Sequence, residues 1–242
     1  ANRPPLPEDL RPQFPLTRDA TRAFNVACIE MAGYEADDIM ATLATMARAA
    51  GGTATIISSD KDLMQLVGPG VMMFDPMKNR AIGPDEVVEK FGVGPERVVD
   101  VQALAGDSVD NVPGAPGIGI KTAALLIQEF GDLETLLARA GEIKQPKRRE
   151  ALLDNADLIR ISRQLVSLDP NVQGLPPLDD YVITKPDPDT IMGFLREMEF
   201  NTLTRRVAEK LKIAPPVMSE TNGFHVAGAH DAAPAPDHLP FD

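Results

Sequence analysis

Two hydrophobic spacings alternate along the first third of the chain. Three short runs rich in apolar and β-branched residues have the character of buried strands, and these are residues 26–31 (VACIEM), 53–59 (TATIISS) and 71–75 (VMMFD). Residues 37–50 (DDIMATLATMARAA) instead place apolar side chains on one helical face, in a helix that we expect the following Gly-Gly pair to end. Strands alternating with a helix predict a parallel sheet with helices on its faces.

The other segments predict helices. Residues 7–24 have helical spacing, although Pro12 and Pro15 are expected to bend or delay that helix. After residue 83 the strand pattern disappears, and two segments place Pro at the first helical position. The helices expected in this part are residues 83–91, 94–105, 121–130, 132–140, 147–168 and 188–200. The fold class predicted is α/β at the start and all-helical afterwards.

These patterns divide the chain into three parts. We expect an α/β part at residues 1–93, a helical part at 94–213 and a flexible linker or tail at 214–242, where Pro and Ala dominate and large apolar residues are few. The opening ANRPPLPEDL has neither an initiator Met nor a signal-peptide pattern. We therefore expect both ends to be cuts through a larger protein.

The rare residues exclude several kinds of chemistry. Cys28 is the single cysteine, so neither a disulfide nor a thiolate zinc site can form within the chain. The three histidines all lie in the tail, at positions 225, 230 and 238, which argues against Ser-His-Asp, Cys-His and histidine–zinc mechanisms. No apolar run approaches the roughly 20 residues of a membrane span. Catalysis would rest on carboxylates, lysines or metals bound by oxygen.

Seven carboxylates form three groups in the sequence. The first two groups follow predicted strands, where ligands gather in open α/β sheets. Several carboxylates without histidine suit Mg²⁺ or Mn²⁺, and two such ions a few ångströms apart can hydrolyse a phosphodiester. The groups are Glu35, Asp37 and Asp38 in GYEADD, Asp60 and Asp62 in SSDKD, and Asp107 and Asp110 in GDSVDN.

Each group also has a simpler interpretation. When each group is considered alone, helix capping is the favoured role for the first and third groups. For the central pair, a turn is as good an explanation as a metal site. Lys61, between the two central acids, is interpreted as a solvated charge. The net charge of −12 argues mildly against a nucleic-acid partner, although bound metal ions would reverse the charge of an acidic site locally.

Residues 113–123 (PGAPGIGIKTA) suggest a loop that binds phosphate. The nucleotide-binding P-loop fails by one residue, because Ile120 separates the second glycine from Lys121 and Thr122. The dinucleotide fingerprint fails because no strand leads into the glycines. Helices are expected on both sides, which suits a helix–hairpin–helix whose N–H groups bind a DNA phosphate regardless of base sequence. In this motif Gly117 and Gly119 would form the turn.

The segments GYEADD, SSDKDLMQLV and GDSVDNVPGAPGIGIKTA together carry a resemblance. Over about residues 1–210 the chain closely resembles the 5′–3′ exonuclease region of bacterial DNA polymerase I, which is related to the flap endonucleases. The resemblance implies a PIN-like parallel-sheet nuclease core with an arch segment, followed by a helical domain with a helix–hairpin–helix. It implies cleavage of duplex DNA at a 5′ flap or 5′ end, in primer removal and repair.

The resemblance also assigns roles to single residues. The seven acids match the family's metal ligands for two divalent ions, with Asp60 and Asp62 as central catalytic acids. Arg3 matches a basic arch residue expected near the scissile bond. The DNA clamp, which in the family often holds a monovalent cation such as K⁺, is matched by Gly117, Gly119, Lys121 and Thr122. The tail resembles the linker toward proofreading and polymerase domains.

One departure from the family concerns the start of the sheet. Family members begin with two strands that end in acids, and both would precede Ala1, so the first strands are expected to be missing. The strand at 53–59 is apolar on both faces and therefore expects neighbours on both edges, without which Ile56 and Ile57 would be exposed. We expect the chain alone to bind DNA weakly through residues 107–123 and to cut a 5′ flap poorly or not at all.

The sequence leaves two other classes of function open. A non-catalytic helix–hairpin–helix module that only binds DNA would share the glycine turn, and a phosphate-binding NTPase is disfavoured by the lysine spacing. Acids in all three groups favour the enzyme. A bacterial cytoplasmic monomer associated with the nucleoid, with no membrane partner, is expected.

Overall fold

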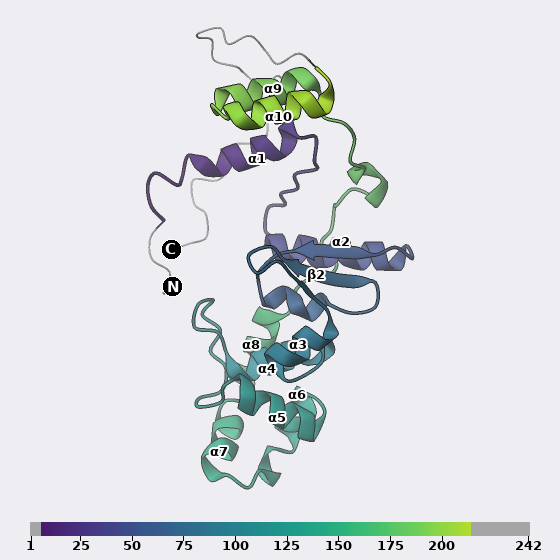
Figure 1. The fold of residues 1–242 in the computed structure, drawn as a ribbon. Helices are drawn as coiled ribbons and strands as arrows, with labels where there is room; N and C mark the ends of the chain where they lie inside the picture. Colours follow the sequence, from purple (N-terminus) through teal and green to yellow (C-terminus); the bar gives the residue numbers. More distant parts are fainter. Residues whose placement is uncertain (1–5, 214–242) are drawn as a thin grey trace. The chain divides into compact units, whose positions relative to one another are not determined.

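The computed structural model describes residues 6–213, which divide into two compact units (Figure 1). Unit 1 contains residues 31–176, and unit 2 combines residues 6–30 with residues 177–213. The predicted tail at 214–242 and the candidate Arg3 lie outside the described residues. The domain boundaries at 93 and 213 stay a prediction. No helix of the described ranges combines the length and the apolar character that a bilayer span requires.

A three-stranded sheet in the order β1-β2-β3 forms the α/β part of unit 1. Strands β1 (Ala54–Ile57) and β2 (Val71–Asp75) pair in parallel, as the sequence predicts, and β3 (Arg80–Ile82) returns antiparallel to β2. Helix α2 (Ala36–Ala49) precedes β1 and ends at a left-handed Gly51 with φ of 77°, so both the helix and its end are confirmed. Strand β3 was not predicted.

One face of β1 is covered, whereas the sequence predicts that both faces are exposed. Among the described residues β1 pairs with β2 alone, so it is an edge strand. Ile57 is 60% exposed, which confirms the predicted exposure, whereas Ile56 is only 6% exposed. Ile56 is paired with Met73 and belongs to the same hydrophobic cluster, and this cluster covers one face of the strand. The prediction that Ile56 would be exposed is therefore wrong.

Helices make up the rest of unit 1, and one predicted helix is in fact two. The predicted helix 147–168 is interrupted at Asn155, whose φ of −118° and ψ of 17° leave the helical region. The Asn155 side-chain amide donates to the carbonyl of Ala151 at 2.8 Å and so satisfies the end of the first helix. The helices are α3 (Pro84–Phe91), α4 (Val98–Ala105), α5 (Ile120–Phe130), α6 (Leu133–Ala138), α7 (Pro146–Asp154) and α8 (Ala156–Val166), with 3₁₀ turns at Asp62–Leu66, Pro95–Arg97 and Ala140–Glu142.

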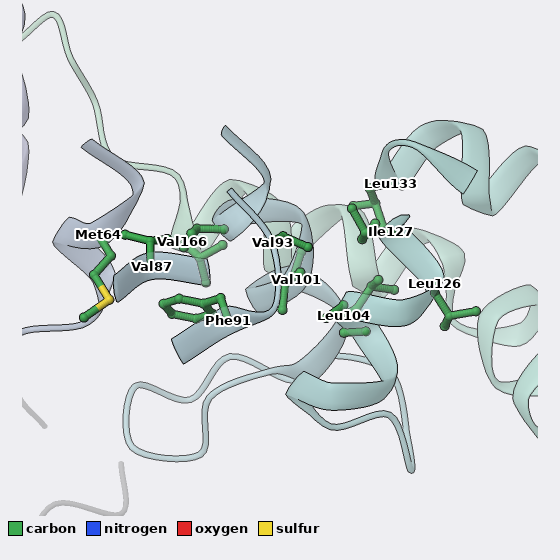
Figure 2. Close-up of a cluster of buried hydrophobic side chains, with 14 of the residues drawn as sticks. Met64, Val87, Phe91, Val93, Val101, Leu104, Leu126, Ile127, Leu133 and Val166 are labelled. Carbon is green, nitrogen blue, oxygen red and sulfur yellow. The ribbon is translucent and has the colours of Figure 1, made fainter. Parts of the chain in front are cut away.

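One continuous hydrophobic cluster joins the sheet to these helices (Figure 2). It extends from Met64 near the sheet past Val166 on α8 and Phe91 to Leu104 and on to Ile127 on α5. Phe91, Leu104 and Ile127 are almost fully buried. Because interiors are close-packed, this shared core fixes the loop after β1 and the turn after α4 relative to each other. Those two loops carry the second and third acidic groups.

Unit 2 has its own small core. Helix α1 (Gln13–Ala23) begins directly after Pro12, which confirms the delayed start. It packs with α9 (Pro188–Glu197) and with α10 (Asn201–Leu211), a helix that was not predicted. The predicted strand at 26–31 is wrong, because these residues have no ladder partner among the described segments and follow a left-handed Asn25. A further 3₁₀ turn is at Leu178–Tyr181.

Candidate metal centre

The first acidic group lies at the N-terminus of α2. Glu35 caps this helix, and its backbone N–H donates to Asp38 Oδ2 at 3.3 Å. Asp38 Oδ1 also accepts from the N–H of Asp169 at 2.8 Å. The capping interpretation therefore holds for Glu35 and Asp38. Asp37 also lies in the first turn of α2, but the capping hydrogen bonds are those of Glu35 and Asp38.

Asp37 connects the first and second groups electrostatically. Burial, followed by repulsion from Asp60, Glu35, Asp62 and Asp38, raises the pKa of Asp37 to about 6. Burial alone raises the pKa of a carboxyl, and the neighbouring carboxylates raise it further, an effect that nearby cations would relieve. Electrostatic repulsion thus links Asp37 on α2 with the two central acids, which follow β1.

The Asp37 carboxyl predicts a pH dependence of stability in EDTA. A carboxyl whose pKa is raised from 3.8 to about 6 binds its proton more tightly in the folded state. The contribution of this carboxyl to the unfolding free energy is complete below the pKa that it has in the unfolded state. It is lost as the pH rises through about 6. The unfolding free energy, measured by urea titration at pH 4.5 and pH 7.5, should change less between these values in Asp37→Asn than in the wild type. Equal pH dependence in both proteins would contradict the assignment.

The central pair begins the turn that follows β1. Asp60 Oδ1 accepts from the N–H of Asp62 at 3.0 Å, and Ser58 Oγ accepts from the N–H of Asp60 at 3.0 Å. The turn interpretation is thus also correct for Asp60. Asp62 accepts a hydrogen bond from the side-chain amide of Gln102 on α4. The central acids are consequently positioned by backbone and side-chain hydrogen bonds.

Gln102 is a residue of the site that the sequence reasoning missed. The residue is 4% exposed, and its side-chain oxygen Oε1 is buried without a hydrogen-bond partner among the described residues. A buried amide oxygen without a partner is costly unless a ligand or ordered water completes it. The available signal was a lone glutamine within the otherwise apolar helical run VQALA. A polar side chain at a core position indicates a polar partner, which here is Asp62.

The third group follows α4 and is linked to the second through Lys61. Lys61 Nζ lies 2.5 Å from Asp107 Oδ2 and 3.2 Å from Asp62 Oδ1. Burial opposes ionisation of Asp107, but the hydrogen bond from Lys61 holds its pKa below the usual value. Asp107 Oδ1 accepts from the N–H groups of Val109 and Asp110, so the predicted cap at this turn is present. The interpretation of Lys61 as a solvated charge is wrong.

The donor atoms suit a hard divalent ion, but the side chains do not form a closed coordination site. All are carboxylate oxygens, the ligands that Mg²⁺ and Mn²⁺ prefer. The raised pKa of Asp37 and the unpartnered oxygen of Gln102 both indicate a place that a cation and its water would stabilise. Within residues 6–213, however, no three acidic, histidine or cysteine side chains lie close enough together to hold an ion.

The glycine turn between α4 and α5 depends on a close approach of two backbones. Gly114 has φ of 63°, and a Cβ there would lie 2.4 Å from the backbone nitrogen of Gly106. Its N–H donates to the buried hydroxyl of Ser162 on α8 at 3.1 Å. The N–H of Ala115 donates to the carbonyl of Leu104 at 2.8 Å. These contacts hold the turn against α4 and α8, and the sequence did not predict them.

The predicted clamp residues lie at the exposed side of the same turn. Gly117 has φ of 76°, Gly119 caps α5, and a Cβ at either position would have no atom within 4 Å. Ile118 between them is buried and anchors the loop. Lys121 is exposed in the first turn of α5, and Thr122 is half-buried with its N–H bonded to the carbonyl of Gly119. The backbone is therefore open to a ligand here.

Comparison with known proteins places both halves of the chain in one family. Residues 1–92 match the 5′–3′ exonuclease N-terminal resolvase-like domain, and residues 93–189 match the 5′–3′ exonuclease C-terminal SAM fold. A flap endonuclease of Cronobacter sakazakii is 41% identical over 180 residues, which cover 72% of each chain. The chain belongs to the 5′–3′ exonuclease family. The α/β core followed by a helical part with a helix–hairpin–helix is the fold of this family, as expected.

Two further relatives of the 5′–3′ exonuclease family extend the comparison. DNA polymerase I of Rhizobium leguminosarum is 59% identical over 209 residues, covering 86% of this chain and 21% of that protein. The chain therefore spans about a fifth of the length of that relative. The structure of the T5 5′-exonuclease with bound divalent zinc ions is 26% identical and has a TM-score of 0.55, covering 58% of this chain and 52% of the T5 chain.

Proposed function

We propose that this chain is the metal-dependent 5′ nuclease part of a DNA polymerase I, and that it hydrolyses phosphodiester bonds at 5′ flaps or 5′ ends. The observation that carries the proposal is that acids from three separate segments of unit 1 interact with one another or through Lys61. Asp60 and Asp62 act electrostatically on Asp37, and the Lys61 contacts join Asp62 to Asp107. The substrate class follows from the family, and primer removal and repair are the processes that need this cut.

The acids would hold two Mg²⁺ or Mn²⁺ ions, and the structure of the related T5 enzyme contains divalent ions. Such ions would activate water and stabilise the leaving oxygen. Asp60 and Asp62 would be central ligands, with Asp37 and Asp107 on either side, and Gln102 would orient Asp62 through its amide. Glu35, Asp38 and Asp110 complete the proposed ligand set, and Arg3 would contact the scissile region.

The glycine turn would bind the duplex away from the cut. Exposed N–H groups near Gly117 and Gly119, at the start of α5, would bind a backbone phosphate and could share a K⁺ ion with it. Lys121 would add a positive charge, and Thr122 would support the turn. Contacts of this kind position DNA without reading its sequence. Duplex DNA with a 5′ flap or 5′ end is the proposed partner, bound by a monomer in the cytoplasm at the nucleoid.

Lys121→Ala tests this clamp. Loss of one phosphate contact should weaken duplex binding about equally for unrelated sequences and reduce the salt slope of log Kd by about one unit. Fluorescence anisotropy with two duplexes of different sequence, at several salt concentrations, measures both quantities. Lys90→Ala removes the same charge from the exposed side of α3 and should leave binding unchanged. A loss that depends on sequence, or no loss, would count against the clamp.

A non-catalytic DNA-binding module is the second candidate. It is favoured by one observation, the lack of three metal-binding side chains in mutual reach within residues 6–213. Both candidates predict DNA binding through the glycine turn, so binding alone cannot separate them. They differ in whether the protein cleaves the DNA when a divalent metal ion is present.

A cleavage assay separates the two candidates. The full-length protein is incubated with a 5′-flap duplex labelled at the flap end, once with Mg²⁺ and once with EDTA. The nuclease should release a labelled flap product in Mg²⁺ and none in EDTA. Binding without any product in Mg²⁺ would establish the module instead. The same assay on residues 1–242 tests the expectation that this chain alone cuts poorly.

A further inference from the structure

Lys61 lies between two of the three acidic groups. Its Nζ contacts Asp107 Oδ2 at 2.5 Å and Asp62 Oδ1 at 3.2 Å. The lysine side chain is 33% exposed, that of Asp62 is 23% exposed and that of Asp107 is 12% exposed. Partly buried pairs of this kind are screened by salt much less than surface pairs. The ammonium is therefore held by the two carboxylates.

The contacts of Lys61 join segments that are distant in the sequence. Lys61 and Asp62 follow β1 at the start of a 3₁₀ turn, whereas Asp107 follows α4. Gln102 on α4 donates to the same oxygen of Asp62, Oδ1, that Lys61 contacts. Asp62 is thus fixed by a neutral donor and a cation at once. Without a cation between them, Asp62 and Asp107 would repel each other at this edge of unit 1.

An ammonium and a divalent ion compete for such oxygens. A carboxylate oxygen that accepts a hydrogen bond from Lys61 offers less of its electron density to a metal, and the lysine charge repels an approaching cation. A metal that binds both acids must take the place between them that Nζ holds.

We propose that Lys61 is an internal counter-ion that holds Asp62 and Asp107 together before metal binds, and that a divalent ion must displace it to occupy this place. The inference rests on the proposed metal-dependent function. Lys61 is a positioning residue here, since it acts through the two acids. Its removal has two opposite consequences, a less stable protein in EDTA and a higher affinity for divalent ions.

The test measures Mn²⁺ binding in the absence of DNA. Electron paramagnetic resonance quantifies the Mn²⁺ that remains free. The full-length protein is compared with Lys61→Met, Lys61→Arg and Lys144→Met, the last removing an exposed lysine before α7. The Lys61→Met protein should bind one Mn²⁺ about tenfold more tightly than the wild type. This gain corresponds to about 1.4 kcal/mol, the cost of displacing one charge contact. Lys61→Arg and Lys144→Met should keep the wild-type affinity. The rise in melting temperature on adding Mn²⁺ should be largest for Lys61→Met.

The outcomes separate this inference from the proposed function. Mn²⁺ binding by the wild type together with equal or weaker binding by Lys61→Met would overturn the role of Lys61 and leave the metal site intact. The absence of saturable Mn²⁺ binding in every variant, including the wild type, would overturn the metal-dependent function and the inference with it. Lys61 is partly exposed, and the melting curve in EDTA shows whether Lys61→Met is folded.

Discussion

Asp60→Asn should abolish cleavage of a 5′ flap by the full-length protein. Asparagine keeps the acceptor oxygen to which the N–H of Asp62 donates at 3.0 Å, so the turn after β1 should persist. The substitution removes one negative charge from the centre of the acids. Because a bound ion contributes several kcal/mol to transition-state stabilisation, its loss should lower the single-turnover rate by roughly a thousandfold or more.

The control for Asp60→Asn is Asp154→Asn, which removes a charge from an exposed acid at the end of α7. This variant should cleave at the wild-type rate. Calorimetric titration with Ca²⁺ adds a second readout, and Asp60→Asn should bind Ca²⁺ more weakly than either other protein. Cleavage by Asp60→Asn at a near-normal rate would show that Asp60 is a turn residue only.

Gly114→Ala should strongly destabilise unit 1. The residue adopts φ of 63°, where an L side chain is strained, and a Cβ would meet Gly106 backbone atoms at 2.4 and 2.7 Å. Backbone cannot move aside as a flexible side chain can. We expect a loss of roughly 3–5 kcal/mol in unfolding free energy, from strain and displaced packing together. Chemical denaturation followed by circular dichroism measures this loss.

Gly117→Ala is the matched control for this effect. Its φ of 76° is similar, but a Cβ would have no atom within 4 Å. The expected cost is therefore only the backbone strain, about 1–2 kcal/mol. Equal destabilisation by the two substitutions would mean that the close approach of Gly106 and Gly114 contributes nothing.

The sequence predicts most regular elements correctly where local signals are strong. Helix α2 combines apolar spacing with a Gly-Gly end, and α3 begins with Pro at its first position, so both were found. Strand β3 is three residues long and is defined only by its pairing with β2, which no local pattern reveals. Residues 26–31 show the opposite case, because an apolar run forms a strand only if an edge is available to pair with it.

The candidate site shows the same limit. The acids are visible as residue types, and both of their predicted local roles, capping and turn formation, are present beside the electrostatic clustering. The contacts between loops are not visible. Gln102 reaches Asp62 across 40 positions and Lys61 reaches Asp107 across 46, and only the packed core between β1 and α4 determines which side chains meet. For this reason the sequence favoured a solvated charge for Lys61, whereas the fold gives its ammonium two carboxylate partners.

Anomalous scattering from crystals of the full-length protein soaked in Mn²⁺ tests the central claim most directly. The claim is that acids from three separate segments hold the ions of a 5′ nuclease. The predicted result is Mn²⁺ bound at about 2.0–2.6 Å by carboxylate oxygens that include Asp60 or Asp62 and also Asp107, with Lys61 displaced from between them. Mn²⁺ bound elsewhere on the protein, with the Lys61 contacts to Asp62 and Asp107 unchanged, would contradict the account.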